Sequence, residues 1–347
     1  MKIHYTAPAW HGGFHKFFGN ALRSLGNEVF YFDDSGTASQ RWSRKIFTRV
    51  PRLQYSVDDR FRQRVSRDWL RSILSFSPDL VILEHAPNII PIAIREIKKD
   101  GYKVFYWIDS PSAGSQAKDL LAGMKEVDKV FSIDRSKEWM TNFFPPDTFC
   151  FLPLAGDQEV FRPLPDVQKE YDVVYVGSFP PQSGDGVIRA EIIANIPSKY
   201  KVAVLGNGIN YWFQFYPQLE KRTITPRALP AEKVNEIYNK AKIVLSIHST
   251  FHIESVSART HEAALAGAFQ IVDWRKDLDE LYPSGLLPRF KWAREVNNLI
   301  DYWISRPEER ENIAAEVREH ALRHNTWRHR AEKMIGYFHT PSKYLSY

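Results

Sequence analysis

The sequence has one cysteine and no long hydrophobic run. The single cysteine, Cys150, excludes an intrachain disulfide framework and any metal site built from several cysteines. It lies in the apolar run Phe149–Leu152, which indicates a buried structural thiol. No run of roughly 18 apolar residues is present, so the sequence predicts no membrane-spanning helix. No signal-peptide core follows the N-terminus, and we therefore expect a cytoplasmic protein.

Low complexity and internal repeats are also missing from the sequence. Hydrophobic residues make up 44% of the chain and charged residues 25%, which excludes disorder throughout. Aromatic residues reach 14%, so large side chains must fill cores or line a ligand cleft. A length of 347 residues predicts two domains.

The excess of positive charge is small, but it is unevenly distributed. Lysine and arginine number 47 against 41 acidic residues, a net charge of +6, which by itself identifies no partner. Between Arg41 and Arg71, however, basic and aromatic residues are interleaved. This segment is consistent with a solvated helical face, with a phosphate-binding surface, or with contact to an anionic membrane. Three of its arginines, Arg60, Arg62 and Arg64, are our candidates for binding an anionic substrate, such as the acceptor of a transferred group.

Short apolar runs alternate with helix-length segments in the first half of the chain. This pattern predicts a mainly parallel sheet with helices on both faces. A helical stretch from Phe14 to about Leu25 follows the first run. The predicted strands are Ile3–Ala7, Glu28–Phe32, Leu80–Leu83, Val104–Ile108 and Val130–Ile133.

A proline cluster from Leu152 to Pro165 interrupts this pattern and predicts an interdomain linker. A second alternation follows, and the C-terminal third has helical spacing. We therefore predict an α/β protein with two Rossmann-like, doubly wound domains that face each other across a cleft. Their expected bounds are 1–155 and 156–330, with 331–347 a tail that returns to the first domain. The predicted strands of the second domain are Asp172–Val176, Val202–Leu205, Ile243–Ile247 and Phe269–Val272.

Ligands of doubly wound sheets bind beyond the carboxyl ends of the strands, which directs attention to the loops there. Gly12 and Gly13, with His11 before them, suit a loop under donor phosphates or an acceptor, or an ordinary turn. Asp109 ends a strand and can orient an acceptor hydroxyl, or cap the next turn. Gly206 opens a Gly-x-Gly loop that can pass beside a nucleotide base.

The segment Glu254–Phe269 contains the most informative pattern. Ser257 is a plausible helix N-cap, which would place Arg259 and Glu262 three residues apart on one face. The first-turn amides would then attract an anion such as a diphosphate. Glu262 could accept hydrogen bonds from ribose hydroxyls, and Glu254 could hold a sugar. The alternative is a surface helix start with an ordinary arginine–glutamate pair.

Two other kinds of site are disfavoured by what the sequence lacks. His248 and His252 are four residues apart, but no third ligand is evident, so we predict no metal site. Neither half contains a complete Gly-x-Gly-x-x-Gly followed by a strand-end acid, which disfavours an NAD-dependent oxidoreductase.

Several blocks in the second half resemble the CgeB-type, group 1 glycosyltransferases. Arg259–Asp273 is similar to the Arg-x-x-Glu-Ala-x-Ala-x-Gly-Ala block of that family. Leu152–Pro163 resembles the linker of these enzymes, and Asp172–Ser178 resembles the first strand and loop of their donor domain. Family-like stretches also follow in order at Asp279–Tyr282, Arg306–Arg310 and His324–Arg330. The resemblance covers about residues 150–335.

The resemblance implies a GT-B architecture in which the second domain holds a nucleotide-sugar, for which we expect UDP as the nucleotide. Glu262 would bind the ribose, Glu254 the donor sugar, and Arg259 would lie near the diphosphate. Gly177 and Ser178 would let the backbone approach the donor. Gly177–Gly186 lacks the basic residue of the family, and Arg189 is the nearest substitute.

The leading hypothesis is a retaining, metal-independent glycosyltransferase without a further cofactor. Its predicted catalytic residues are Glu254, Asp109 and Arg259. The acceptor is expected to be anionic, such as hydroxymethylated DNA or a cell-surface polymer. The alternative is a catalytically silent protein that binds a nucleotide-sugar or nucleic acid on the same scaffold.

Overall fold

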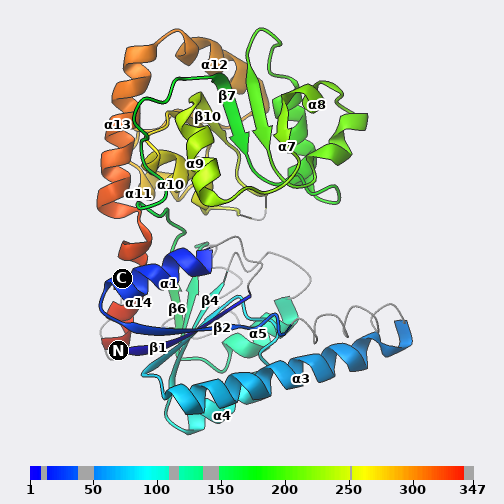
Figure 1. The fold of residues 1–347 in the computed structure, drawn as a ribbon, viewed down its shortest axis with the longest axis vertical. Helices are drawn as coiled ribbons and strands as arrows, with labels where there is room; N and C mark the ends of the chain where they lie inside the picture. The colour runs from blue at the N-terminus through cyan, green and yellow to red at the C-terminus, as the bar shows by residue number, and fades with distance from the viewer. Residues whose placement is uncertain (9–13, 38–50, 109–116, 136–147, 251, 340–347) are drawn as a thin grey trace. The chain divides into compact units, whose positions relative to one another are not determined.

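The computed structural model describes residues 1–8, 14–37, 51–108, 117–135, 148–250 and 252–339. The chain forms two compact units. Unit 1 comprises Met1–Pro153 together with the chain from Arg328 onward, and unit 2 comprises Leu154–Trp327. Each unit contains one six-stranded sheet with helices around it (Figure 1). The predicted α/β class with two doubly wound parallel sheets is confirmed.

The sheet of unit 1 has the strand order β2-β1-β3-β4-β5-β6, and all its pairs are parallel. Its central strands are buried on both faces, which explains their continuous apolar runs. Strand β6 is only three residues long and contains Cys150, which is buried as predicted. The strands are β1 (Lys2–Ala7), β2 (Glu28–Asp33), β3 (Leu80–Glu84), β4 (Lys103–Ile108), β5 (Lys129–Ser132) and β6 (Phe149–Phe151).

The long helix α3 (Pro51–Phe76) packs one apolar stripe onto this sheet. Phe61, Val65, Trp69 and Ile73 are buried at helical spacing. The indole nitrogen of Trp69 donates a hydrogen bond to Thr6 in β1, at 2.8 Å. The other helices of this unit are α1 (Phe14–Ser24), α4 (Pro91–Lys99), α5 (Ala117–Met124) and α14 (Trp327–His339).

Helix α14 packs on unit 1. The ammonium of Lys103 in β4 donates to the carbonyl of Phe338 at 3.1 Å and lies over the Phe338 ring. The guanidinium of Arg330 donates to the carbonyl of Pro153 at 3.0 Å. The last described helix therefore belongs to the unit in which the chain begins.

The sheet of unit 2 has the order β12-β11-β10-β7-β8-β9, again with parallel pairs only. The chain runs outward from β7 through β8 to β9, then returns to β10 and runs outward the other way. The topological switch point therefore lies between β7 and β10. The strands are β7 (Tyr171–Val176), β8 (Val202–Leu205), β9 (Thr223–Thr225), β10 (Ala241–Ser246), β11 (Gln270–Asp273) and β12 (Arg289–Phe290).

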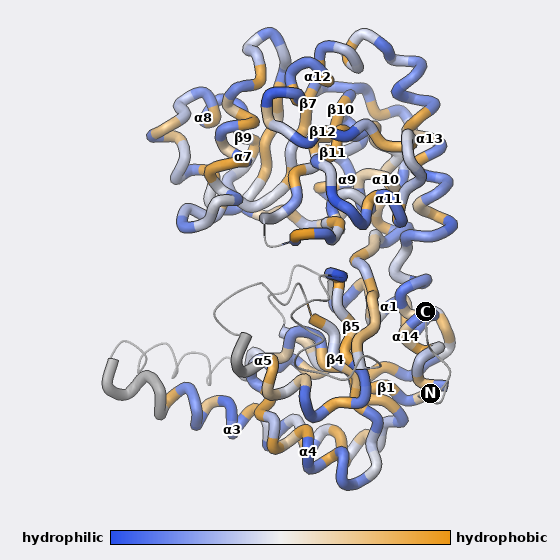
Figure 2. The backbone as a smooth tube through the Cα atoms, turned by 180° about the vertical axis from the view of Figure 1, so that it is seen from behind, coloured by the Kyte–Doolittle hydropathy of each residue, from blue (hydrophilic) through white to orange (hydrophobic). Residues whose placement is uncertain are grey.

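Helices cover both faces of this sheet and complete two hydrophobic clusters. The central strands are coloured as hydrophobic in Figure 2. The longer helices are α7 (Gly184–Ala194), α9 (Ala231–Asn239), α10 (Ala258–Leu265), α12 (Val296–Ile304) and α13 (Pro307–His324). The short ones are η2 (Ile209–Gln214), α8 (Gln218–Arg222), α11 (Leu278–Leu281) and η3 (Ala293–Glu295).

Two buried asparagines of α9 fix the proline-rich segment that enters unit 2. Asn235 accepts from the amide of Arg162 at 3.1 Å and donates back to its carbonyl at 3.0 Å. Asn239 accepts from the amide of Leu164 at 2.8 Å. The segment is thereby tied to unit 2 although it has no regular secondary structure.

Candidate functional site at the carboxyl edge of the unit 2 sheet

The loops after β7 and β8 touch each other through glycine backbones. A Cβ on Gly206 would lie 1.5 Å from the carbonyl oxygen of Gly177. A Cβ on Gly177 would lie 2.3 Å from the hydroxyl of Tyr175. The amide of Phe179 donates to the carbonyl of Asn207 at 2.7 Å, which joins the two loops further. The sequence predicted both glycines as donor-binding, and the structure brings them together where no larger residue fits.

The loops after β7 and β10 are bound to each other through Arg189 of α7. Its guanidinium donates to the carbonyls of Ser178 at 2.9 Å and Ile247 at 3.3 Å. Only 7% of the residue is exposed. Arg189 therefore connects the two loops of the switch point through their carbonyls. Its contact with a donor phosphate stays a prediction. Ser178 itself is exposed at the loop surface.

Asp185, in the first turn of α7, is the second connection to the β10 loop. Its buried carboxylate accepts hydrogen bonds from the Ser249 hydroxyl at 2.5 Å and from the amide and hydroxyl of Thr250 at 2.6 Å. Burial alone would raise the pKa of Asp185, but these bonds outweigh it and hold the pKa below its usual value. This residue was not among those predicted from the sequence. Its place in the first turn after the N-cap Ser183 was the available signal.

Helix α10 begins as predicted, with Ser257 as its N-cap. The Ser257 hydroxyl accepts from the amide of Arg259 at 3.3 Å. The guanidinium of Arg259 contacts the carboxylate of Glu262 at 2.6 Å. The Glu262 side chain is 5% exposed, whereas that of Arg259 is 40% exposed. The predicted pair is thus present, with its carboxylate in the interior and its cation at the surface.

Arg259 is a cation of this site that a ligand can reach. Desolvation opposes its charge, but Glu262 and the neighbouring Tyr238 prevail and raise the pKa of Arg259. Tyr175 lies close to both Arg189 and Arg259, and burial raises its pKa to about 12. Tyr175 therefore stays a neutral phenol between two permanent cations.

Glu254 lies in the loop between β10 and α10. Its carboxylate contacts the ammonium of Lys276 at 3.0 Å, and its carbonyl accepts from the amide of Asp277 at 3.0 Å. The Glu254 side chain is 21% exposed. The loop after β11 thus fixes Glu254, and part of its carboxylate is accessible to a ligand.

A charged network that the sequence analysis did not predict ties β10, β11 and α10 together. Asp273 accepts from the amide of His248 at 2.8 Å and contacts its imidazole. The guanidinium of Arg275 lies 2.9 Å from the other carboxylate oxygen. The hydroxyl of Thr260 lies 3.3 Å from the second imidazole nitrogen. Burial acts to raise the pKa of Asp273, but His248 and Arg275 lower it.

The remaining predicted site residues lie in unit 1. Arg60 and Arg64 are exposed and share one face of α3. Arg62 is partly buried, and its charge acts on the buried Tyr106, so it lies on the packed side of the helix. The structure thus separates Arg62 from the other two. His11, Gly12, Gly13 and Asp109 lie outside the described residues.

The described part of the chain lacks two further features. No three histidine, cysteine, aspartate or glutamate side chains are grouped there as metal ligands would be. None of the described helices has the length and apolar character needed to cross a bilayer.

Comparison with known proteins gives one family match and many similar structures. Residues 189–336 match the model of the family described as glycosyl transferase-like. No curated protein sequence matches the chain. Sucrose-phosphate synthase from Thermosynechococcus elongatus is similar at a TM-score of 0.70, with 14% identity over 97% of this chain and 98% of that one.

Two further similar structures contain a bound nucleotide or an analogue of a nucleotide-sugar. Anabaena HepE in complex with UDP and glucose has a TM-score of 0.69 and 13% identity, over 97% of this chain and 99% of that one. A trehalose-6-phosphate protein from E. coli bound with UDP-2-fluoro glucose has a TM-score of 0.64 and 12% identity, over 99% and 100% of the two chains. At these identities the similarity establishes the fold.

Proposed function

We propose that this chain, which has the GT-B fold and matches a glycosyl transferase-like family model over residues 189–336, transfers a sugar from a UDP-sugar bound at the carboxyl edge of the unit 2 sheet. The observation that carries the proposal is the Arg259–Glu262 pair at the start of α10, with Arg259 close to Tyr175 near the end of β7. UDP as the nucleotide is supported by the UDP and UDP-sugar complexes of similar structures. The narrower resemblance to CgeB-type enzymes stays a prediction.

The roles of the two glutamates follow from their surroundings. One oxygen of Glu262 accepts from Arg259, and the other has no hydrogen bond to any described residue. That second oxygen can accept the ribose hydroxyls. Glu254, fixed by Lys276, offers an acceptor for the hydroxyls of the donor sugar.

Stabilisation of the leaving diphosphate falls to groups of the protein itself. Arg259 and the first-turn amides of α10 supply positive charge where the diphosphate separates from the sugar. A cation already positioned by Glu262 needs little reorganisation during the reaction. We therefore propose transfer without a metal ion and, from the paired glutamates of the resemblance, with retention of configuration.

The test compares UDP-sugar turnover by the wild-type chain, Glu262→Gln and the control Glu236→Gln. Glu236 is a surface carboxylate of α9 that pairs with Lys233 at 2.7 Å. Losing a hydrogen bond to a charged partner costs about 1.5–3 kcal/mol, so Glu262→Gln should lower kcat/KM by roughly 10- to 100-fold. Equal turnover by all three proteins would show that the donor site is elsewhere.

Two further measurements separate the finer parts of the proposal. Activity that survives EDTA supports metal independence, and loss of activity that magnesium restores contradicts it. Proton NMR of the first product gives its anomeric configuration. An inverted product would contradict the retaining mechanism and leave the donor site intact.

For the acceptor, we propose an anionic polymer that binds along α3. Arg60, Arg64, Arg67 and Arg71 are all exposed and recur at helical spacing, so they form one stripe. Arg71 has an acidic neighbour, Asp68, at 3.5 Å. The stripe extends about 16 Å along the helix, since each residue adds about 1.5 Å.

Duplex DNA is the first probe of this stripe. Binding should weaken steeply with salt, and Arg64→Gln with Arg67→Gln should reduce the slope by about 2, one for each lost phosphate contact. The control is Arg95→Gln, which removes an exposed arginine from α4. Absence of binding, or a slope unchanged by the double substitution, would rule out nucleic acid. Binding to anionic vesicles alone would favour a membrane surface.

A further inference from the structure

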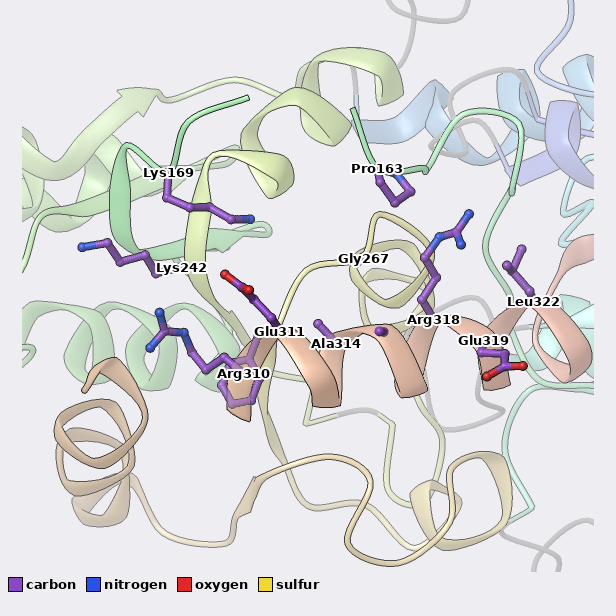
Figure 3. Close-up of a pocket in the computed structure, with 12 residues that line it drawn as sticks. Pro163, Lys169, Lys242, Gly267, Arg310, Glu311, Ala314, Arg318, Glu319 and Leu322 are labelled. Carbon is purple, nitrogen blue, oxygen red and sulfur yellow. The ribbon is translucent and has the colours of Figure 1, made fainter. Parts of the chain in front are cut away.

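A cavity of about 370 Å³ lies in unit 2 on the side of the sheet away from the candidate donor site. Lys169 precedes β7, Lys242 is near the start of β10, and Phe269 precedes β11, so these residues mark the amino ends of the strands. Helix α13 forms the opposite wall (Figure 3). The carboxyl ends of the same strands lead into the loops of the donor site, which makes this a separate site.

Three cations of the cavity are held by backbone carbonyls. The ammonium of Lys169 donates to the carbonyl of Asn239 at 2.9 Å. The guanidinium of Arg310 donates to the carbonyl of Ile304 at 2.9 Å, and that of Arg318 to the carbonyl of Leu265 at 3.2 Å. Carbonyls orient these groups without neutralising their charge. Burial lowers the pKa of Lys169 and of Arg310, and the nearby carboxylate of Glu311 acts against this lowering in both.

The other charges of the cavity largely cancel. Lys242 is paired with Asp172 at 2.8 Å, and Glu319 is paired with Arg323. What remains is Lys169, Arg310 and Arg318 against the single carboxylate of Glu311, a net charge of +2. Glu311 projects from α13 on the same side as Lys169 and Lys242 (Figure 3).

The rest of the lining is apolar and small. Phe269 is 4% exposed and forms part of the wall. Ala314, Ala315 and Gly267 leave space beside it because their side chains are short or absent. A ligand that suits this lining has a compact carbon skeleton and an anionic group.

We propose that this cavity binds a small organic phosphate monoester, drawn by Lys169, Arg310 and Arg318 and packed through its carbon skeleton against Phe269. A phosphate monoester carries about −1.5 to −2 charges at neutral pH, which matches the net charge of the lining. Arginine forks and lysine ammoniums are the usual donors to phosphate oxygens. Burial lowers the pKa of Arg310 more than Glu311 and Asp172 raise it, so its charge is partly desolvated.

The experiment uses phenyl phosphate as the probe, with inorganic phosphate and phenol as partial probes. Its affinity for the full chain is measured by isothermal titration calorimetry, and its effect on melting temperature is recorded. The pocket variants are Lys169→Gln and Arg318→Gln. The controls are Lys233→Gln, which removes a surface lysine from α9, and Glu262→Gln, which alters the donor site.

Phenyl phosphate should bind and raise the melting temperature of the wild-type chain and of both controls. Each pocket variant should lose about tenfold or more in affinity, as expected for one charge-assisted hydrogen bond. Phenyl phosphate should also bind more tightly than inorganic phosphate, which lacks the carbon skeleton, and more tightly than phenol, which lacks the phosphate.

Three results would overturn the proposal. They are the absence of binding to the wild-type chain, unchanged affinity in both pocket variants, and loss of binding in Glu262→Gln, which would assign the probe to the donor site. Lys169 is exposed, so its replacement tests binding with little risk to folding. Failure here leaves the UDP-sugar proposal intact, since that proposal depends on turnover and on Glu262.

Discussion

Replacing Asp185 by asparagine tests whether the switch-point loops are held by a buried charge. The carboxylate of Asp185 accepts three hydrogen bonds of 2.5–2.6 Å from Ser249 and Thr250. Bonds to an ionised acceptor contribute about 1 kcal/mol more each than bonds between neutral groups. Three such bonds add about 3 kcal/mol, and the cost of burying the charge of Asp185 offsets part of this. Asp185→Asn should therefore lower the free energy of unfolding by about 2 kcal/mol.

Urea unfolding of both proteins between pH 3 and pH 8 is the assay. Because the folded-state pKa of Asp185 is lowered, its stabilisation is complete above the ordinary aspartate value of about 4. It is lost as the pH falls through the lower, folded-state value. The difference between wild type and variant should therefore be about 2 kcal/mol at pH 7 and shrink below about pH 4.

A difference under about 0.5 kcal/mol at pH 7, the range of an ordinary surface substitution, would refute this reasoning. A difference that stays constant down to pH 3 would show that shape, and not charge, is what the variant loses. Glu236→Gln, on the surface of α9, is the control for the method and should change stability by less than about 0.5 kcal/mol. We also expect Asp185→Asn to weaken UDP binding, since the loop after β10 loses an anchor.

Four further substitutions test single residues of the two units. Gly206→Ala should prevent unit 2 from folding, because its Cβ would lie 1.5 Å from a backbone oxygen. Gly26 has φ +80° and open space around it. Gly26→Ala should therefore lower the free energy of unfolding in urea by only about 1–2 kcal/mol. Burial lowers the pKa of His4 from 6.5 to about 3, so the free energy of unfolding should fall by up to about 1.4 kcal/mol for each pH unit between 6.5 and about 3. His4→Phe should flatten that slope in pH-dependent unfolding. Asn239→Ala should lower the free energy of unfolding in urea by about 1–3 kcal/mol, because the amide of Leu164 loses its acceptor.

The sequence was sufficient for the parallel sheets and for the start of α10. Buried parallel strands are continuous apolar runs, and runs such as Leu80–Leu83 could be predicted from that property alone. The strands β6, β9 and β12 were not predicted, because with three, three and two residues they are too short for such a signal. Ser257, Arg259 and Glu262 were predictable because capping and i,i+3 pairing are local rules.

Local sequence rules could not predict contacts between residues that are far apart in the sequence. His248 and Asp273 are separated by 25 residues and meet only because β10 and β11 are neighbours in the sheet. The same limit explains the arginines of α3. Arg62 is close in sequence to Arg60 and Arg64, but helical phase turns it toward the packed side.

The two arginines proposed to contact the donor diphosphate, Arg189 and Arg259, differ in their exposure and in their hydrogen-bond partners. Both guanidinium groups of the switch point lie near Tyr175, but Arg189 is 7% exposed and donates to two carbonyls of the loops. Arg259 has a 40% exposed side chain and contacts the buried carboxylate of Glu262. A phosphate oxygen can therefore reach Arg259 without displacing a backbone contact. Because the same guanidinium also orients Glu262, diphosphate binding and ribose binding should be coupled, and substitutions at the two residues should not be additive.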